Sequence, residues 1–299
     1  MSAGSSEADD FEGWLRGRVP ERGLQAKAAA VLETLLAQPR RASYSSAAEL
    51  AELAGANVAT VIRTAQALGF SGWPTLQQEL RARYLSALSA PEVAAEHADA
   101  VVTGSPASAS LRRDLDNVAL LARSVDIAAA RGLAAAIGQA RRTVVVAAGS
   151  YTSVGIALAH NAQLAGYDAQ LATGYGGGGP ANTIAQLTGQ DVLVVVSFWR
   201  LNESAVVAAE EAAAKGARVF VITDAASPAL AAAAERILLA PTEGISFFPS
   251  LTAAMALVQA VVAELATLDP GRTKAAVEAA EAQWARFGLL HRPTRRGRT

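Results

Sequence analysis

The sequence predicts two domains of different class: an α-helical helix-turn-helix domain and, after it, an α/β domain with a doubly wound parallel sheet of five strands. Three observations predict this fold. The chain has 299 residues, of which 52% are hydrophobic, so it is long and apolar enough for two packed cores. Residues 46–69 contain two short helical patterns separated by Gly55. From residue 143 onward, apolar strand-like runs alternate with helical patterns, which is typical of parallel sheets.

The two short helices of residues 46–69 are expected to form the helix-turn-helix. The first ends at Ala54, because Gly55 tolerates the positive φ of a helix C-terminus. Asn57 can cap the second helix, and Gly69 ends it. One face of the second helix is apolar and is expected to be buried. That face carries Val58, Val61, Ile62, Ala65 and Leu68.

The opposite face of the second helix is typical of a DNA reader. Its side chains are small or polar and forked, which suits close approach to a major groove, and Thr60 and Arg63 are expected to give most of the specificity. The cations of residues 40–41 are expected to hold phosphates. The predicted DNA-binding residues are Arg40, Arg41, Asn57, Ala59, Thr60, Arg63, Thr64 and Gln66. An ordinary alanine-rich helical hairpin is the alternative interpretation, since short helix pairs are common.

The sequence predicts boundaries for the domains and for the segments around them. Residues 1–20 are polar and acidic and are expected to be a disordered tail, and residues 21–88 form the helix-turn-helix domain. A linker is expected over residues 89–117, with one long helical pattern from residue 111 to residue 140. The second domain spans 118–268, and 269–299 form a C-terminal helix and a basic tail. The last nine residues contain four arginines, so this tail either contacts DNA phosphates or is a solvated end.

Five strands are expected in the second domain, over residues 143–148, 168–172, 191–197, 218–223 and 236–240. Ligands of such sheets bind where the strands end and the helices begin. Two loops at that edge, residues 149–153 and 197–204, carry hydroxyls and one cation and are expected to converge on one anion-binding crevice. The predicted effector-binding residues are Ser150, Ser153, Ser197, Arg200 and Ser204. The serines could instead only cap helices.

Composition excludes several kinds of site. The chain has no cysteine and three scattered histidines, so neither a thiolate site nor a histidine metal site is expected, and no cofactor is predicted. The net charge of -1 restricts any DNA contact to a local patch. The N-terminus lacks the features of a secretory signal, and no apolar run reaches the roughly 18 residues of a membrane span. A cytoplasmic protein without membrane contact is therefore expected.

Three stretches of the sequence are distinctive: AELAELAGANVATVIRTAQALGFSGWPTLQQEL, VVVAAGSYTSVG and GARVFVITDAASPALAAAAERILLAP. Together they resemble the RpiR family of bacterial transcriptional regulators, which join a helix-turn-helix domain to a sugar isomerase (SIS) domain. The resemblance covers roughly residues 20 to 268. It implies a SIS-like fold, operator DNA as a partner and a sugar-derived effector.

One loop departs from the family pattern. Phosphosugar-binding SIS domains commonly have a Ser-x-Ser-Gly-x-Thr loop, whereas this chain has Ser-Phe-Trp-Arg-Leu-Asn from Ser197 to Asn202. Only the first serine is kept. Arg200 could replace the missing hydroxyls with a charge-assisted hydrogen bond to a phosphate.

The expected function is a transcriptional regulator that binds operator DNA as a homodimer or homotetramer and responds to a small anionic, sugar-related effector. An enzyme is not expected. The alternative is a sugar-phosphate isomerase with an accessory helical domain, which would need an acid/base pair; the crevice offers Glu203 or Glu243 without a partner histidine at recognisable spacing. A scaffold that uses the reader helix for protein contacts is a third possibility.

Overall fold

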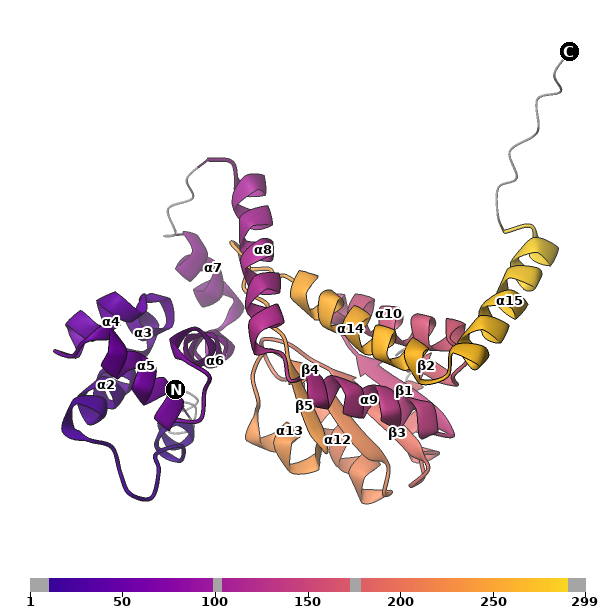
Figure 1. Cartoon of the computed structure of the whole chain (residues 1–299), viewed down its shortest axis with the longest axis horizontal. Coiled ribbons are helices and arrows are strands. Elements are labelled where there is room, and N and C mark those ends of the chain that lie inside the picture. Colours follow the sequence, from indigo (N-terminus) through magenta and orange to yellow (C-terminus); the bar gives the residue numbers. More distant parts are fainter. Residues whose placement is uncertain (1–10, 99–103, 173–178, 290–299) are drawn as a thin grey trace, which may run out of the picture.

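The computed structural model describes residues 11–98, 104–172 and 179–289 and contains both predicted kinds of fold (Figure 1). Short helices gather into an N-terminal helical domain, and a five-stranded sheet between two layers of helices forms the C-terminal domain. The predicted fold class is confirmed.

The N-terminal domain is built from short helices that pack on one core. Its helices are α2 (Ala26–Ala37), α3 (Pro39–Tyr44), α4 (Ala47–Leu53), α5 (Val58–Ala67) and α6 (Trp73–Ser86). Ser46 begins α4 with a capping box, in which its hydroxyl accepts from the Glu49 N–H at 3.2 Å and its own N–H donates to the Glu49 carboxylate at 2.7 Å. Gly55 has a φ of +58° and ends α4, so the predicted turn between α4 and α5 is confirmed.

Two features of this domain differ from the prediction. Residues 11–16 are helical and Leu15 is fully buried in the domain core, so the predicted tail 1–20 is wrong for this part; residues 1–10 lie outside the described residues. The short helix α3 was not predicted. It is a six-residue helix that Pro39 begins, and so few residues give no periodic apolar pattern.

The segment between the two domains is also more helical than expected. Helices α7 (Ala90–Ala98) and α8 (Pro106–Ser124) occupy most of the predicted linker 89–117, and α8 is followed by α9 (Ile127–Gln139). The single long helix expected over residues 111–140 is therefore wrong. Asp126 causes the break, because its carboxylate accepts from the Ala129 N–H at 2.9 Å and caps a new helix.

The sheet has the strand order β2-β1-β3-β4-β5, and all four pairings are parallel. Its strands are β1 (Arg142–Ala147), β2 (Ala169–Leu171), β3 (Asp191–Val196), β4 (Arg218–Thr223) and β5 (Arg236–Leu239), each close to its predicted bounds. The central strand β3 is buried on both faces, because Val194 contributes to one core and Leu193 and Val195 to the other.

Helices cover both faces of the sheet, as a doubly wound fold requires. One layer contains α9, α10 (Thr152–Leu164) and α14 (Thr252–Leu268), and the other contains α11 (Gly179–Ala185), α12 (Glu203–Ala214) and α13 (Pro228–Ala233). Strand β2 lies on one side of β1, and the following strand β3 lies on the other side. The strand order therefore reverses between β1 and β3, which is the topological switch point of the sheet. The carboxyl ends of these strands form the edge where ligands are expected.

The last helix, α15 (Pro270–Phe287), extends away from the sheet domain and buries none of its residues (Figure 1). The basic tail 291–299 lies outside the described residues. Within the described part, no single helix has the length and hydropathy of a membrane span; α14 and α15 reach both only when taken together, across a bend of 106°.

Candidate functional site

Helix α5 exposes much of the predicted DNA-reading face. Ala59, Arg63 and Gln66 are exposed. Asn57 caps the helix as predicted: its side-chain oxygen accepts from the Thr60 N–H at 2.8 Å and from the Thr60 hydroxyl at 2.9 Å. The hydroxyl proton of Thr60 is therefore used inside the protein, while the oxygen keeps its capacity to accept.

The buried side of α5 differs from the predicted one. Val58 and Ile62, expected in the core, are 41% and 38% exposed, whereas Thr64, expected to face DNA, is 1% exposed. The buried side of α5 consists of Val61, Thr64 and Ala65, and the opposite side of the helix is exposed to solvent. Thr64 can be buried because its hydroxyl donates to the Thr60 carbonyl at 2.8 Å.

The two arginines of α3 lie in different surroundings. Arg40 donates from Nε to the Glu96 carboxylate of α7 at 2.9 Å, and Glu96 also accepts from the Tyr84 hydroxyl at 3.1 Å. Arg41 is exposed. A phosphate contact by Arg40 would therefore compete with this ion pair, while Arg41 is open to solvent.

A cavity of about 590 Å³ lies at the carboxyl ends of β3 and β4, and we call it the edge cavity. Ser197 and Arg200 line it from the loop after β3, and the segment after β4 closes another side. Helix α6 contributes its last turn, with Arg83 and Tyr84. A ligand in the edge cavity would therefore contact both domains at once.

The other predicted effector residues lie outside the edge cavity. Ser150 is exposed on the loop after β1 and Ser153 is exposed in the first turn of α10, where its hydroxyl donates to the Ser150 carbonyl at 2.8 Å. Ser204 lies in the first turn of α12, and both its N–H and its hydroxyl bond to the Asn202 side-chain oxygen, at 3.0 and 2.8 Å. The structure thus brings Ser197 and Arg200 together and places the other three serines apart from them.

The two predicted loops do meet, but through aromatic rings. Tyr151 of the first loop contacts Phe198 of the second edge to face, with ring centroids 5.4 Å apart. Burial raises the pKa of Tyr151 from its ordinary value of 10 to about 12.

Trp199 is a site residue that sequence reasoning did not assign. Its φ of +59° is the only positive value of a non-glycine residue in the described part of the chain. A bulky side chain rarely adopts this conformation, which marks a constrained position. Its backbone N–H donates to both carboxylate oxygens of Asp224, at 3.0 and 3.1 Å. Its ring contacts the ring of Phe247 edge to face, with the ring centroids 5.1 Å apart. Trp199 lines the edge cavity.

Asp224 holds this loop from the end of β4. Its carboxylate also accepts from the Thr242 hydroxyl at 2.7 Å. Burial raises the pKa of Asp224 to about 6, although the hydrogen bonds from Thr242 and Trp199 oppose the shift. In the sequence, Asp224 stands out only as part of the Thr223-Asp224 pair in the third stretch that resembles the RpiR family.

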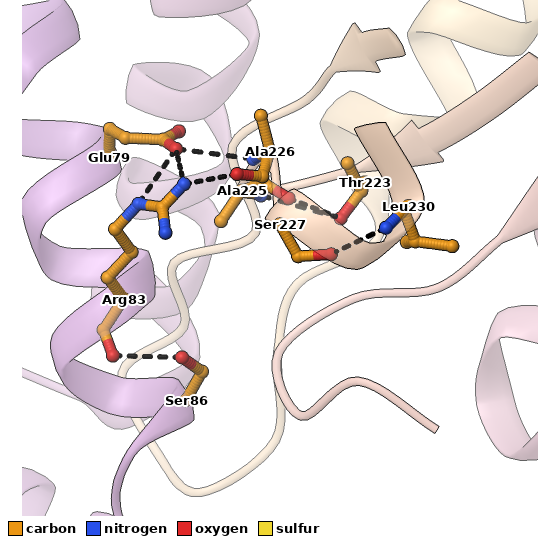
Figure 2. A network of polar contacts seen from close by, with 8 residues as sticks. All are labelled: Glu79, Arg83, Ser86, Thr223, Ala225, Ala226, Ser227 and Leu230. Atoms are coloured by element: carbon orange, nitrogen blue, oxygen red, sulfur yellow. Dashed lines mark hydrogen bonds and ion pairs between the residues drawn. The ribbon is translucent and has the colours of Figure 1, made fainter. Parts of the chain in front are cut away.

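A buried polar network joins α6 to the segment after β4 (Figure 2). Arg83 donates to Glu79 at 3.1 and 2.9 Å and also to the Ala226 carbonyl, while the Ala226 N–H donates to Glu79 at 3.2 Å. Glu79 and Arg83 are 3% and 9% exposed, and the Arg83 guanidinium lies over the ring of Trp14 at 4.2 Å. Each charge is therefore paired with an opposite charge and with backbone groups of the other domain.

A second cavity, of about 380 Å³, lies between α6, α8 and the loop after β5. Glu243 of that loop forms ion pairs with Arg81 of α6 and, at 3.3 Å, with Arg113 of α8. Trp199 and Asp224 line this cavity as well as the edge cavity. Glu243, considered above as an isomerase base, is thus engaged by two guanidinium groups.

Comparisons with known proteins give one family match in each of the two domains. Residues 18–87 match the helix-turn-helix domain of the rpiR family, and residues 136–264 match the SIS domain. The sugar isomerase domain of the RpiR transcription factor from Sphaerobacter thermophilus is 26% identical, with a TM-score of 0.56, over 59% of this chain and 98% of its own. No curated protein sequence matches the chain.

A second solved structure extends across both domains. The Vibrio vulnificus NanR protein complexed with ManNAc-6P is similar over 94% of this chain and 100% of its own, with 19% identity and a TM-score of 0.58. This likeness supports the shared fold. The helix-turn-helix match, the SIS match that follows it and the similarity to a solved RpiR domain together identify the chain as a member of the rpiR family of transcriptional regulators.

Proposed function

We propose that the protein is a DNA-binding transcriptional regulator whose affinity for its operator changes when a sugar phosphate binds at the edge cavity of the SIS domain. The observation that carries this proposal is the position of the cavity. It lies where β3 and β4 end, and the last turn of α6 from the helix-turn-helix domain forms one wall. A ligand that fits only one arrangement of these two walls shifts the equilibrium between arrangements.

The edge cavity offers suitable chemistry for a phosphorylated sugar. Arg200 can supply a guanidinium for a charge-assisted, bidentate bond to a phosphate, and Ser197 can supply a hydroxyl. Arg83 also lines the cavity but is already paired with Glu79. A relative with a similar fold, NanR, was solved with ManNAc-6P, which makes this ligand a reasonable first candidate.

DNA binding is assigned to α5, with Arg63 and Gln66 at base edges and Arg41 at a phosphate. Thr60 remains a candidate through its acceptor oxygen. A single helix contacts few base pairs, so we propose that the protein acts as a homodimer or homotetramer whose reader helices occupy half-sites about one DNA turn apart. The cytoplasm is the compartment that this function requires.

A regulator without catalytic activity is part of the same proposal. An isomerase needs a base that is free to take a proton from carbon. Glu243 is held by Arg81 and Arg113, and Glu203 lies exposed in the first turn of α12, away from the cavity lining. Neither arrangement favours proton transfer.

The test measures DNA affinity with and without candidate effectors. Full-length protein first selects duplexes from a random-sequence library. The affinity for a selected duplex is then measured by fluorescence anisotropy at fixed salt, with glucose 6-phosphate, ManNAc-6P, the two unphosphorylated sugars or inorganic phosphate. We expect a sugar phosphate to change the affinity by about 5- to 150-fold, the usual range of allosteric coupling.

Two variants locate the effector. Arg200→Ala should reduce the response to the active sugar phosphate, whereas Arg286→Ala, which removes an exposed arginine of α15, should leave it unchanged. An equal response in wild type and Arg200→Ala would remove Arg200 from the effector site. Retained DNA binding without any response to sugar phosphates would reject this effector class.

A further inference from the structure

Helix α5 presents an apolar pair that the fold does not use. Val58 and Ile62 are 41% and 38% exposed, and neither belongs to the core of the helical domain or to the side chains packed against it. One exposed aliphatic residue on a protein surface is ordinary. Here two of them stand one helical turn apart on the helix that is expected to enter the DNA groove.

Val58 and Ile62 lie beside the exposed residues of the predicted DNA-reading face of α5. Val58 precedes the exposed Ala59, and Ile62 precedes the exposed Arg63 and lies one turn before Gln66. Among the described residues, Arg63 has no ion-pair partner. The exposed side of α5 therefore combines an apolar edge with a free guanidinium and an amide.

We infer that Val58 and Ile62 contact the C5-methyl groups of thymines in the major groove and make the protein select thymine at the operator positions they face. Thymine displays a methyl group at that surface, and aliphatic side chains recognise it by excluding water. This inference rests on the proposed function, because it needs α5 to lie in the groove. It adds a preference for thymine beside the guanine that Arg63 can read.

The experiment removes the methyl groups from the DNA and the side chains from the protein in turn. A duplex selected by the full-length protein is synthesised with single thymines replaced by deoxyuridine, which keeps base pairing and loses only the methyl. Wild type should lose about fourfold in affinity per contacted thymine, because the burial of one methyl group no longer contributes to binding. Ile62→Ala and Val58→Ala should each abolish that loss at one position.

Two control variants separate this contact from other effects. Arg63→Ala should weaken binding to both duplexes and leave the thymine-to-uracil ratio unchanged. Val207→Ala, which truncates an exposed valine of α12, should change neither quantity. Because Val58 and Ile62 are outside the core, their alanine variants should unfold at the wild-type urea concentration.

The outcomes distinguish the inference from the proposed function. Failure of the wild type to retain any duplex would overturn the proposed function and the inference with it. A retained duplex whose affinity does not depend on any thymine methyl would overturn the inference alone. The inference would also be overturned if the two alanine variants kept the wild-type thymine preference but lost self-association, since the pair would then belong to a subunit interface.

Discussion

The indole N–H of Trp199 donates a hydrogen bond of 3.0 Å to the backbone carbonyl of Leu85. Trp199 lies in the loop after β3 of the SIS domain, and Leu85 lies in the last turn of α6 of the helix-turn-helix domain. The bond therefore links the edge of the sheet directly to the DNA-binding domain. Trp199 also lines the edge cavity, so a ligand there would meet a side chain that already contacts the other domain.

We predict that Trp199→Phe uncouples effector binding from DNA binding. Phenylalanine keeps a ring near Phe247 and the same backbone strain, but it cannot donate to Leu85. The effector-dependent change in DNA affinity, about 1–3 kcal/mol in a typical allosteric protein, should fall toward zero. Anisotropy titrations with and without the active sugar phosphate measure it. Trp284→Phe on α15 is the control, and a wild-type response in Trp199→Phe would contradict the proposed link.

A second prediction concerns the buried ion pair of α6. Glu79→Ala leaves the Arg83 guanidinium, only 9% exposed, without its carboxylate, and it also removes the acceptor of the Ala226 N–H. Loss of one partner of a buried pair typically costs about 3–5 kcal/mol of unfolding free energy, and urea unfolding measures this loss.

The matched control for that prediction is an exposed ion pair. Glu33→Ala breaks the contact of Glu33 with Arg16, where both side chains are about half exposed and the bond is 2.9 Å long. Exposed pairs contribute little to stability, so this variant should unfold near the wild-type urea concentration. Equal losses in the two variants would show that the buried Glu79–Arg83 pair contributes no more to the unfolding free energy than an exposed pair does.

The sequence predicted the regular elements well because their signals are local. Apolar runs such as residues 191–196 and 218–223 identify buried parallel strands on their own, and Asn57 and Gly69 set the two ends of the reader helix α5. The side of α5 that is buried was not predictable in this way. It depends on how α2, α4 and α6 pack around α5, and a ten-residue helix with apolar groups on two edges fits more than one arrangement.

The site residues show the same limit. Ser197 and Arg200 were predicted because hydroxyls and a cation after a strand are recognisable in sequence. Trp199 and Asp224 were missed, because their importance comes from a backbone conformation and a burial that exist only after folding. The same holds for the wall supplied by α6, which lies more than a hundred residues away along the chain.

A third prediction follows from the helix over residues 11–16. Leu15→Ala should lower the unfolding free energy by about 2–5 kcal/mol, because it opens a cavity in the core of the helical domain. Leu115→Ala makes the same truncation at a residue that is 71% exposed and should change stability by less than about 0.5 kcal/mol. Urea unfolding compares the two. A small effect of Leu15→Ala would mean that residues 11–16 are not part of the folded domain.

The last prediction concerns Asp224 and pH. Burial raises the pKa of this carboxyl in the folded protein to about 6, from an ordinary value of 3.8. Between these two values the folded state binds more protons at Asp224 than the unfolded state does. This carboxyl therefore stabilises the fold most at low pH, and its contribution falls as pH rises from about 4 to about 6.

We expect Asp224→Asn to remove this dependence. The asparagine side chain stays uncharged, and its oxygen can still accept from the Trp199 N–H and the Thr242 hydroxyl. Urea unfolding at a series of pH values should show wild type losing roughly 3 kcal/mol relative to Asp224→Asn between about pH 4 and pH 6. Because other titrating groups are common to both proteins, they cancel in the difference. Parallel pH profiles would mean that Asp224 keeps an ordinary pKa, and the burial of its carboxylate would then cost the fold little.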